Sequence, residues 1–569
     1  MDTGSHNEGI AKLLIDQLVQ LGVETFCVAP GSRSTALTLA VAQHPTAQTH
    51  LHFDERGLGF LAVGIAKGSR KPVAIITTSG TAVGNLMPSV MEASLDATPL
   101  IILTADRPSE LRDCSANQTC DLVKLFTNFV RFQTDLPLSD GQLPAQYVKA
   151  TLAHAVFLST GPTPGPVHIN CMFREPLFAN TPVEHVSQSA CQWETGERVV
   201  SSETLLAWAK RFSDQQGVII VGSLPPHAPI ASILTLAERL NWPIIADPLS
   251  QMHTVGHHSH LLSNGDLLVR CGASQPVNAV LQLGDRFVSK TISEWLKQLA
   301  PALYLHVAEH TQRHDPSSIV THRLQASPTY FANELARILP ENHKNLSWKQ
   351  ADEMVQRTLS SYFKEQTQLS EPNVVDCLAK YLTPDLAVFL ASSMPIRDAN
   401  LFLTPDHPIG PIIGNRGLSG IDGNIATVVG LTHGLRQPVV ALLGDLACLH
   451  DLNSLALLKD AAHPVCLIVI NNGGGGIFSF LPISQKKDVF ERFWAAAHSH
   501  SFAQAASLFH IPHHEPSKTE DLKELLQQFS RNPTTLFIEI RTERQANIQL
   551  HQEIIEEVKR CLIKAPCPL

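Results

Sequence analysis

The chain has 569 residues, 44% of them hydrophobic and 17% charged, and a formal net charge of −9 at pH 7. This length exceeds what one hydrophobic core usually serves, so three domains are the natural expectation. The negative charge gives no electrostatic reason to expect nucleic acid or an anionic membrane as a partner.

Cysteine usage and hydropathy indicate which cellular compartment to expect. The 11 cysteines are scattered, without a Cys-x-x-Cys pair, as in proteins of reducing compartments. No apolar run approaches the roughly 18 residues of a membrane span, and no basic-then-apolar export signal is recognisable. We therefore expect a cytoplasmic protein without membrane partners.

Three stretches of the chain repeat one pattern: a short apolar run, a Gly- or Ser-rich turn, a helical segment and another apolar run. Strands separated by helices of this length predict parallel sheets with right-handed crossovers. We expect an α/β protein with three doubly wound parallel-sheet domains, whose ligands bind beyond the carboxyl ends of strands. The expected domains are residues 1–182, 198–340 and 369–569.

In the first stretch, polar motifs follow apolar runs. Arg33 lies in a Pro-Gly-Ser-Arg-Ser turn expected to open a helix, where an anion is favoured. Glu55 precedes a helix expected over residues 58–67; an acidic residue at this position is also an ordinary response to the helix dipole. The small residues 77–82, expected to lead into a helical segment through residue 93, are either a strand end with an N-cap or a surface for a flat ring.

Five cationic residues are expected in loops that follow strands. They are Arg33, Arg107, Lys290, Arg397 and Arg416. A single arginine is usually solvated surface, but arginine also suits bidentate recognition of carboxylates. The tract 257–260 (His-His-Ser-His) resembles a metal-binding run; with few acids nearby, we expect it to be an exposed loop without a ligand.

Near the C-terminus, an acid and an amide each follow an apolar strand. Asp445 follows the run 439–443, and Asn472 follows the run 465–470. Oxygen ligands at the ends of neighbouring parallel strands suit Mg²⁺ that keeps water and ligand phosphates. Either half alone is usually a turn, but the pair at this spacing favours a metal site. Glycines 473–476 permit close backbone approach, and the sequence after them does not favour the helix that a dinucleotide fingerprint requires.

Four further motifs carry a specific resemblance. They are residues 30–34 (PGSRS), 104–108 (TADRP), 111–118 (LRDCSANQ) and 415–423 (NRGLSGIDG). With the acid–amide pair, they make nearly the whole chain resemble the thiamine diphosphate (ThDP)-dependent 2-succinyl-5-enolpyruvyl-6-hydroxy-3-cyclohexene-1-carboxylate synthase family of menaquinone biosynthesis. The resemblance implies that 2-oxoglutarate is decarboxylated on the thiazolium carbon of ThDP, and that the resulting carbanion adds to isochorismate by conjugate addition. It also implies Mg²⁺ or Mn²⁺ as the metal.

The resemblance further assigns site residues. Glu55 would contact the aminopyrimidine ring, while Asp445, Asn472 and the carbonyl of Gly474 would bind the metal. The implied cofactor-binding residues are Glu55, Gly80, Thr81, Ile421, Gly444, Asp445, Leu446, Asn472, Gly474, Ile477 and Phe478. The implied substrate-binding residues are Ser32, Arg33, Arg107, Asn117, Gln118, Lys290, Ser393, Arg397 and Arg416. Of all these, Glu55, Ser32, Gln118, Ser393 and Arg397 are the expected catalytic residues.

Two positions depart from the family pattern. Leu446 replaces the second glycine of a Gly-Asp-Gly motif, and Thr291 follows Lys290 where some relatives have arginine. The first change is expected to be compatible with metal binding, and the second concerns one contact to the acceptor rather than the type of reaction.

The resemblance also implies an assembly, and two alternatives are open. Glu55 and Asp445 would come from different chains, so a homodimer or homotetramer with active sites between subunits is expected. The alternatives are another ThDP-dependent 2-oxoacid decarboxylase or acetolactate-type synthase, and a non-catalytic ThDP-binding paralogue. The arginines argue against the first. The joint presence of Glu55, Asp445 and Asn472 argues against the second.

Overall fold

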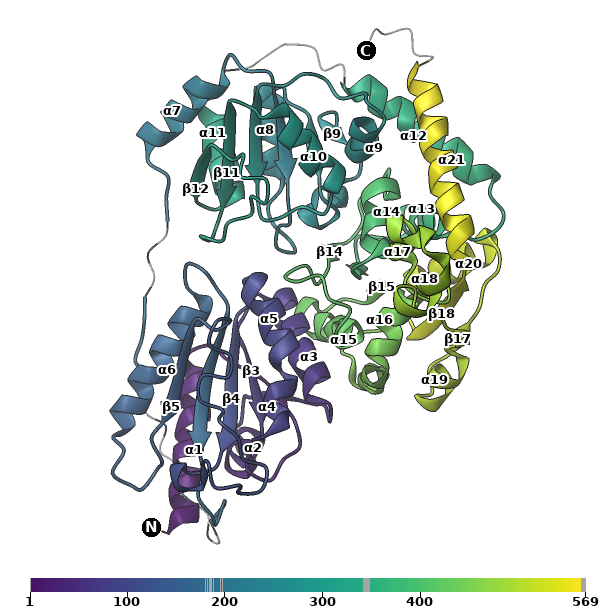
Figure 1. Ribbon diagram of the computed structural model, residues 1–569. Helices are drawn as coiled ribbons and strands as arrows, with labels where there is room; N and C mark the ends of the chain where they lie inside the picture. The colour runs from purple at the N-terminus through teal and green to yellow at the C-terminus, as the bar shows by residue number, and fades with distance from the viewer. Residues whose placement is uncertain are drawn as a thin grey trace. The chain divides into compact units, whose positions relative to one another are not determined.

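The structure is a computed structural model that describes residues 2–179, 181, 183, 187, 189–194, 196, 198–340 and 348–563. Its named strands form three six-stranded sheets, in which the strand pairs are parallel. Helices accompany each sheet (Figure 1). The α/β fold class expected from the sequence is confirmed.

The first and third sheets share one strand order. The first has the order β2-β1-β3-β4-β6-β5, and the third has the equivalent order β14-β13-β15-β16-β18-β17. The strands of the first are β1 (Thr25–Val28), β2 (Gln48–Leu51), β3 (Val73–Thr77), β4 (Leu100–Asp106), β5 (Phe132–Leu136) and β6 (Pro166–Met172). Those of the third are β13 (Ala387–Leu390), β14 (Ile412–Ile413), β15 (Val439–Gly444), β16 (Val465–Asn471), β17 (His513–His514) and β18 (Leu536–Arg541).

The second sheet follows a different winding, β12-β11-β10-β7-β8-β9, which is the strand order of dinucleotide-binding folds. Its strands are β7 (Gly217–Val221), β8 (Ile244–Ala246), β9 (Leu261–Leu262), β10 (Ala279–Leu283), β11 (Leu303–Ala308) and β12 (His322–Gln325). In all three sheets the central strands are predominantly apolar, such as the fully buried β3 and β10. Such strands are typical of parallel sheets covered on both faces.

The helices connect these strands. The first sheet has α1 (Thr3–Gln20), α2 (Thr35–Gln43), α3 (Glu55–Ser69), α4 (Thr81–Asn85), α5 (Met87–Leu95) and α6 (Ala145–Thr160). The second has α7 (Ser202–Phe212), α8 (Ala231–Leu240), α9 (Gly265–Arg270), α10 (Lys290–Leu299), α11 (Pro328–Ile338) and α12 (Trp348–Glu365). The third region has α13 (Glu371–Tyr381), α14 (Met394–Phe402), α15 (Asn424–Leu435), α16 (Asp445–His450), α17 (Gly476–Ser479), α18 (Lys487–Phe493), α19 (Ala503–Leu508), α20 (Thr519–Arg531) and α21 (Arg544–Ile563).

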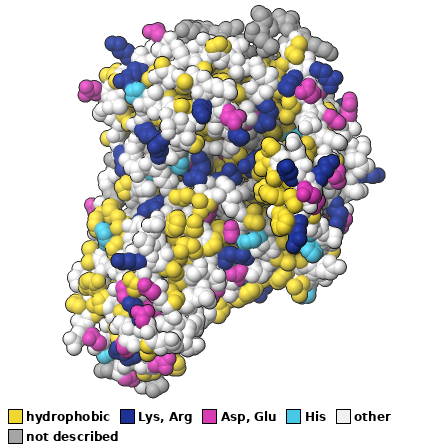
Figure 2. All heavy atoms as spheres, viewed as in Figure 1, with side chains coloured by type: hydrophobic (Ala, Val, Ile, Leu, Met, Phe, Trp, Pro, Cys, Tyr) yellow, Lys and Arg dark blue, Asp and Glu magenta, His cyan; other side chains and the backbone are white. Residues whose placement is uncertain are grey.

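Some of the connections contain 3₁₀ helices. These helices are η1 (Ser109–Leu111), η2 (Pro248–Ser250), η3 (Met252–Val255), η4 (Leu452–Asp460) and η5 (Pro482–Gln485). Among the described residues, no helix is both long enough and apolar enough to cross a membrane. On the face shown in Figure 2, Lys and Arg side chains are scattered among Asp and Glu side chains.

Some sequence expectations need correction. The helix expected over 58–67 begins at Glu55 itself, because Asp54 caps it by accepting a hydrogen bond from the Arg56 amide at 3.0 Å. The single helical segment expected through residue 93 is two helices, since Pro88 lies in the first turn of α5 and its ring interrupts the hydrogen bonding of a continuous helix.

The chain packs as two compact units. The first comprises residues 1–196, 415–437 and 450–463, and the second comprises residues 197–414, 438–449 and 464–569. The first unit therefore holds the first sheet together with α15 and η4. Within it, α3 and α15 cross at glycines: a Cβ added to Gly430 would lie 2.2 Å from the Leu61 carbonyl oxygen and 2.9 Å from the Gly64 Cα. Backbone packs directly on backbone there.

Gly430→Ala is expected to lower the free energy of unfolding by roughly 1–3 kcal/mol, because the added methyl group overpacks a contact that has no side chain to move aside. Denaturant titration measures the change. Gly9→Ala is the matched control, since α1 has open space at that position; there alanine should be neutral or stabilise by up to about 1 kcal/mol. Equal stability of the two variants would contradict this account of the helix contact.

Candidate functional site

The acid–amide pair of the sequence lies at one edge of the third sheet, in the second unit. Strands β15 and β16 are parallel neighbours, with Gly444 paired to Ile470. Asp445 and Asn472 therefore follow the carboxyl ends of adjacent strands, where doubly wound folds bind ligands. Both strands are apolar and buried up to this edge, so the sheet fixes the backbone that carries the two side chains.

The Asp445 carboxylate is buried and held by backbone donors. Its Oδ1 accepts from the Leu446 amide at 2.6 Å, and its Oδ2 accepts from the Gly474 amide at 2.9 Å. His498 Nε2 lies 3.3 Å from Oδ2. Burial raises the pKa of Asp445, while these two amides oppose the shift. A bound cation would offset the cost of burying this charge.

Asn472 presents an oxygen without a partner. Its Nδ2 donates to Glu371 Oε1 at 2.9 Å, whereas its buried Oδ1 has no hydrogen-bond partner. Buried polar atoms are normally satisfied, so this oxygen is placed to meet a ligand. Thr542 also donates to Glu371 Oε1, at 3.1 Å. Burial, together with repulsion from Asp398, raises the pKa of Glu371 to about 7.

The glycine segment supplies a third oxygen. Gly474 has φ +144°, and a Cβ there would lie 2.3 Å from the Ala495 carbonyl oxygen, so glycine is required. The Gly474 carbonyl accepts one hydrogen bond, from the Gly476 amide at 2.9 Å, which leaves a lone pair available. A carboxylate, an amide oxygen and a carbonyl together fit Mg²⁺ or Mn²⁺.

Two details of this edge differ from a simple motif reading. The glycines do lead into a helix, the four-residue α17 (Gly476–Ser479), although the sequence after them was expected not to form one; a single turn is allowed because Pro482 comes only afterwards. Leu446, the departure from Gly-Asp-Gly, donates through its backbone amide. Any residue can make that contact, and Leu446 is not among the residues with positive φ.

Glu55 is the first residue of α3, in the first unit, and is half-buried. In the described part of the chain, no hydrogen bond or ion pair engages its carboxylate. Its neighbours are fixed: Asn453 Nδ2 donates to Asp54 Oδ2 at 2.7 Å, and Arg56 Nη2 donates to the His450 carbonyl at 2.6 Å. The helix start is anchored on both sides of a carboxylate that is available for a ligand.

The first unit also gathers several predicted substrate residues. Arg107 donates to the Gln118 carbonyl at 2.8 Å and to Ser79 Oγ, and Gln118 Nε2 donates to the Ser79 carbonyl at 3.0 Å. Burial and the nearby charge of Arg33 lower the pKa of Arg107. Gly80 packs against Gln118, whose Cγ would lie 2.8 Å from an added Cβ. Arg33 itself donates to the Phe173 carbonyl and to Glu175 Oε1, both at 3.0 Å, so an anionic ligand would compete with the exposed Glu175 carboxylate for this guanidinium group.

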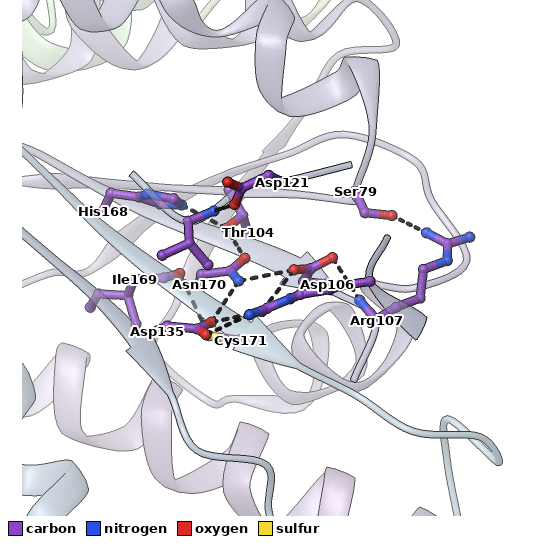
Figure 3. A network of polar contacts seen from close by, with 12 residues as sticks. Ser79, Thr104, Asp106, Arg107, Asp121, Asp135, His168, Ile169, Asn170 and Cys171 are labelled. Atoms are coloured by element: carbon purple, nitrogen blue, oxygen red, sulfur yellow. Dashed lines mark hydrogen bonds and ion pairs between the residues drawn. The ribbon is translucent and has the colours of Figure 1, made fainter. Parts of the chain in front are cut away.

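A network of polar contacts around Asp106, Asp135 and Asn170 holds the segment that begins at Arg107 (Figure 3). Asp106 Oδ1 accepts from the Arg107 amide at 2.8 Å, and Asp106 Oδ2 accepts from Asn170 Nδ2 at 3.1 Å. Arg112 contacts Asp135 with both terminal nitrogens, at 2.9 and 3.0 Å. Arg112 of the 111–118 motif therefore has a structural partner, and the network fixes the loop rather than contacting a ligand.

The other predicted residues are distributed over both units. Ile421 and Arg416 lie in the first unit, while Ser393, Arg397 and Lys290 lie in the second. Ser393 has a strained backbone with φ +75°, and its carbonyl accepts from Arg397 Nη1 at 2.6 Å. With ψ −133° as well, Ser393 lies outside the left-handed helical region that turns and helix ends use, and such sparsely populated conformations cluster at functional sites. Burial lowers the pKa of Arg397.

The remaining predicted residues have less defined surroundings. Ser32, Thr81, Asn117 and Phe478 are exposed, whereas Gly444 and Ile477 are half-buried. The side chain of Lys290 is 87% exposed and lies 3.4 Å from Glu294. Lys290 and Arg397 lie on α10 and α14 rather than in loops as expected, because these helices begin directly after their connections, with Ser289 and Ser393 at the N-caps.

Sequence reasoning missed Glu371, which orients Asn472, and His498, which adjoins Asp445. The residues around Glu371 indicate only that a helix begins there, since Ser370 precedes it and Pro372 follows it. Its partner lies in a distant part of the chain, so only the fold reveals the pair.

Comparisons with known proteins identify the class of protein. The N-terminal TPP binding domain of thiamine pyrophosphate enzymes matches residues 9–125, the middle domain of thiamine pyrophosphate matches 180–390, and the C-terminal TPP binding domain matches 401–540. An X-ray structure from Mycobacterium smegmatis, described as that of a thiamin diphosphate-dependent enzyme, has the same fold, with a TM-score of 0.70 and 17% identity over 94% of this chain and 99% of its own. The protein is a ThDP-dependent enzyme, of a class that uses Mg²⁺ or Mn²⁺ with the cofactor.

Curated relatives define the family. The protein named 2-succinyl-5-enolpyruvyl-6-hydroxy-3-cyclohexene-1-carboxylate synthase in Salinibacter ruber is 39% identical over 97% of this chain and 96% of its own length. The protein of the same name in Rubrobacter xylanophilus is 37% identical over 96% of this chain and 97% of its own length. The chain belongs to the 2-succinyl-5-enolpyruvyl-6-hydroxy-3-cyclohexene-1-carboxylate synthase family.

Proposed function

We propose that this protein decarboxylates 2-oxoglutarate and joins the resulting four-carbon unit to isochorismate by conjugate addition, in the pathway to menaquinone. The observation that carries the proposal is the match, along nearly the full length of both chains, to relatives named for this reaction. The oxygen atoms of Asp445, Asn472 and Gly474 at one strand edge support the proposal. The Glu55 carboxylate, which has no partner in the described part of the chain, supports it as well.

At the metal end, three groups would bind the ion. The Asp445 carboxylate, the Asn472 amide oxygen and the Gly474 carbonyl lie on the β15–β16 edge. Glu371 holds Asn472 Nδ2, so the oxygen cannot exchange places with the nitrogen without losing a hydrogen bond. Gly80, Thr81, Ile421, Gly444, Leu446, Ile477 and Phe478 are proposed to complete the cofactor contacts.

The reaction centre depends on Glu55. When bound, ThDP supplies a thiazolium carbon that stabilises the negative charge left by decarboxylation. The half-buried Glu55 carboxyl is proposed to hydrogen-bond a ring nitrogen of the aminopyrimidine and to exchange a proton there. Its lack of another partner within the described chain supports this role.

The substrate end is proposed to consist of cations and polar groups. Arg33, Arg107, Lys290, Arg397 and Arg416 would bind substrate carboxylates, and Ser32, Asn117, Gln118 and Ser393 would bind carboxylates or hydroxyls. Both substrates are dicarboxylates, which a protein of net charge −9 can attract only through locally concentrated cations. Of these groups, Ser32, Gln118, Ser393 and Arg397 are proposed to act at the reacting atoms.

The proposal is tested by incubating the protein with ThDP, Mg²⁺, 2-oxoglutarate and isochorismate and following the coupled product by mass spectrometry. A product with the mass of isochorismate plus 2-oxoglutarate less carbon dioxide is expected, and pyruvate should not replace 2-oxoglutarate. Efficient acetolactate formation from pyruvate alone would favour the alternative synthase. Cofactor binding without turnover of either substrate would favour a non-catalytic paralogue.

Arg397→Ala is expected to raise the KM for a dicarboxylate substrate and lower kcat/KM by the equivalent of about 1.5–3 kcal/mol, the usual range for a hydrogen bond to a charged group. Arg337→Ala is the control, because Arg337 is 69% exposed on α11. Steady-state kinetics with each substrate varied in turn measures the effect. Unchanged constants in the Arg397 variant would remove it from the substrate site.

The active assembly is proposed to be a homodimer or homotetramer with sites shared between subunits. Glu55 and Asp445 lie in separate compact units, a division that allows the two halves to come from different chains. Mixing inactive Glu55→Gln and Asp445→Ala chains tests this: a mixed dimer with shared sites has one intact site, so random pairing restores about a quarter of wild-type activity. Sites within single chains would restore none.

The remaining proposals concern domain limits and location. Residues 1–182, 198–340 and 369–569 are proposed as the pyrimidine-binding, central and diphosphate-binding domains, and each range contains the strands of one sheet. A cytoplasmic location is proposed from the free cysteines of the described chain, as expected in a reducing compartment.

A further inference from the structure

A cluster of metal-ligating side chains lies in the second unit, in loops that follow strands of the second sheet. It is not part of the β15–β16 edge, where the metal ion of the cofactor is proposed to bind. Among the described residues, Asp285, His310 and His314 each offer one ligand atom, and these atoms lie within 4.8 Å of one another. Asp285 follows β10 after Gly284, and the two histidines follow the neighbouring strand β11. The parallel pairing of β10 and β11 brings the two loops to one edge.

The distances suit a small ion. His310 Nε2 lies 2.8 Å from Asp285 Oδ1, and His314 Nε2 lies 3.9 Å from the same oxygen. Ligands of tetrahedral zinc, with bonds of about 2.0–2.2 Å, lie about 3.4 Å apart. The 2.8 Å contact is a direct hydrogen-bonded pair of His310 and Asp285, which an ion would separate by about 0.6 Å, whereas the 3.9 Å separation would shorten by about 0.5 Å. Side-chain rotations of this size would close a three-ligand site.

Two ring nitrogens of the cluster lack partners. The side chains of His310 and His314 are only 6% and 7% exposed, yet His310 Nδ1 and His314 Nε2 make no hydrogen bond. Buried imidazole nitrogens are normally satisfied. An ion bound between His314 Nε2, His310 Nε2 and Asp285 would engage the unpartnered nitrogen of His314, which points to a missing ligand.

The backbone around the cluster is already fixed. The Asp285 amide donates to the Ser223 carbonyl at 3.0 Å, which ties the loop after β10 to the loop after β7. His306 Nε2 lies 2.8 Å from the Gly284 carbonyl oxygen and holds the turn before Asp285. The order of the second sheet reverses between β7 and β10, and the cluster lies one strand further along, where the loops after β10 and β11 meet at the carboxyl ends of the strands.

The donor set selects the ion. Two imidazoles and one carboxylate favour zinc, cobalt or nickel over Mg²⁺ or Ca²⁺, which prefer oxygen ligands. The charge of Arg286 also acts on His314, so the ion must gain enough from nitrogen coordination to overcome that repulsion. Three protein ligands leave an open position for water.

We propose that Asp285, His310 and His314 form a binding site for a first-row transition-metal dication such as Zn²⁺, separate from the Mg²⁺ site of the cofactor. The ion joins the loop after β10 to the loop after β11. Lys290, at the start of α10, lies five residues beyond Asp285 in the sequence, so a bound ion restrains the segment that leads to this predicted substrate residue.

The test uses the full-length chain, freed of metal with a chelator and then saturated with ThDP and Mg²⁺. Co²⁺ is added as the probe, because its visible absorption is intense only in four- or five-coordinate sites. One Co²⁺ per chain is expected, displaced by an equal amount of Zn²⁺. His310→Ala and His314→Ala should each weaken Co²⁺ binding by more than about 100-fold, and His306→Gln by about 10- to 100-fold.

Controls separate this site from other histidines and from the reaction. His257→Ala, in the exposed part of the 257–260 tract, should leave the spectrum unchanged, and Asp445→Ala should leave it unchanged even if cofactor binding fails. Asp285→Asn, which conserves shape, should weaken binding without unfolding the chain, as checked by circular dichroism. Absence of the spectrum, or the same affinity in folded Asp285→Asn and His314→Ala chains, would overturn the proposal.

Discussion

Asp445→Ala is expected to weaken Mg²⁺ and ThDP binding together by at least about 100-fold, because residues that merely orient a metal ligand already contribute 10- to 100-fold. The carboxylate accepts two backbone hydrogen bonds at the β15–β16 edge, and alanine supplies no oxygen. Calorimetric titration of the metal-free variant with ThDP, at several Mg²⁺ concentrations, measures both affinities.

The stability of the cofactor-free variant distinguishes lost binding from lost folding. Burial raises the pKa of Asp445, so its ionised form is disfavoured in the folded chain. The contribution of Asp445 to the free energy of unfolding therefore falls as pH rises above the ordinary pKa of an aspartate. Asp445→Ala removes this penalty but leaves the Leu446 and Gly474 amides without their acceptor, so the cofactor-free variant should stay folded, with a free energy of unfolding within about 3 kcal/mol of that of the cofactor-free parent. Asp406→Ala is the control, since its side chain is 90% exposed. Unchanged ThDP affinity in the Asp445 variant would refute the metal assignment.

Glu55→Gln is expected to lower kcat by roughly 10²- to 10⁴-fold, the usual contribution of a positioned acid–base group. Glutamine preserves the size of the side chain at the start of α3 but cannot exchange a proton as a carboxyl does. The Asp54 cap and the contact of Arg56 with His450 do not involve Glu55, so folding should be unaffected. Single-turnover kinetics with bound ThDP measures the loss.

The matched control for Glu55 is Glu24→Gln, which alters an exposed glutamate paired with Lys71 at 3.3 Å. Its turnover should equal that of the parent. The Glu55 variant should also bind ThDP within a few-fold of the parent, because the metal end of the cofactor is untouched. Turnover of the Glu55 variant close to that of the control would exclude Glu55 from proton transfer.

Sequence reasoning predicted the fold well where the strands are long and apolar. Strands such as β3 and β16 are runs of buried β-branched residues, and their spacing predicts parallel sheets without tertiary information. Pro88, which divides α4 from α5, was a local signal that the expectation of one helix through residue 93 overlooked. The packing of α15 and η4 with the first sheet was not, because it depends on contacts between segments far apart in the chain.

From the sequence, residues of the candidate site could be predicted only where they belong to a recognisable local motif. Asp445, Asn472 and Glu55 each follow or open a recognisable element. By contrast, Glu371 orients Asn472 from a helix of ordinary appearance, and Asp285 meets His310 and His314 only through the pairing of β10 with β11. The adjacent histidines of residues 257–260 resemble a metal-binding run but were expected to bind no ligand, whereas nothing in the sequence marks the three separated residues of the cluster.

The glycine contact between α3 and α15 places a constraint on how this enzyme can vary. Glu55 opens α3, and Gly64 lies nine residues further along the same helix, about 13 Å at 1.5 Å per residue. A bulkier residue at the contact would push the whole helix as a stiff rod and displace the carboxylate at its tip. Substitutions at position 430 would thus alter turnover without contacting the active site, even in variants that stay folded.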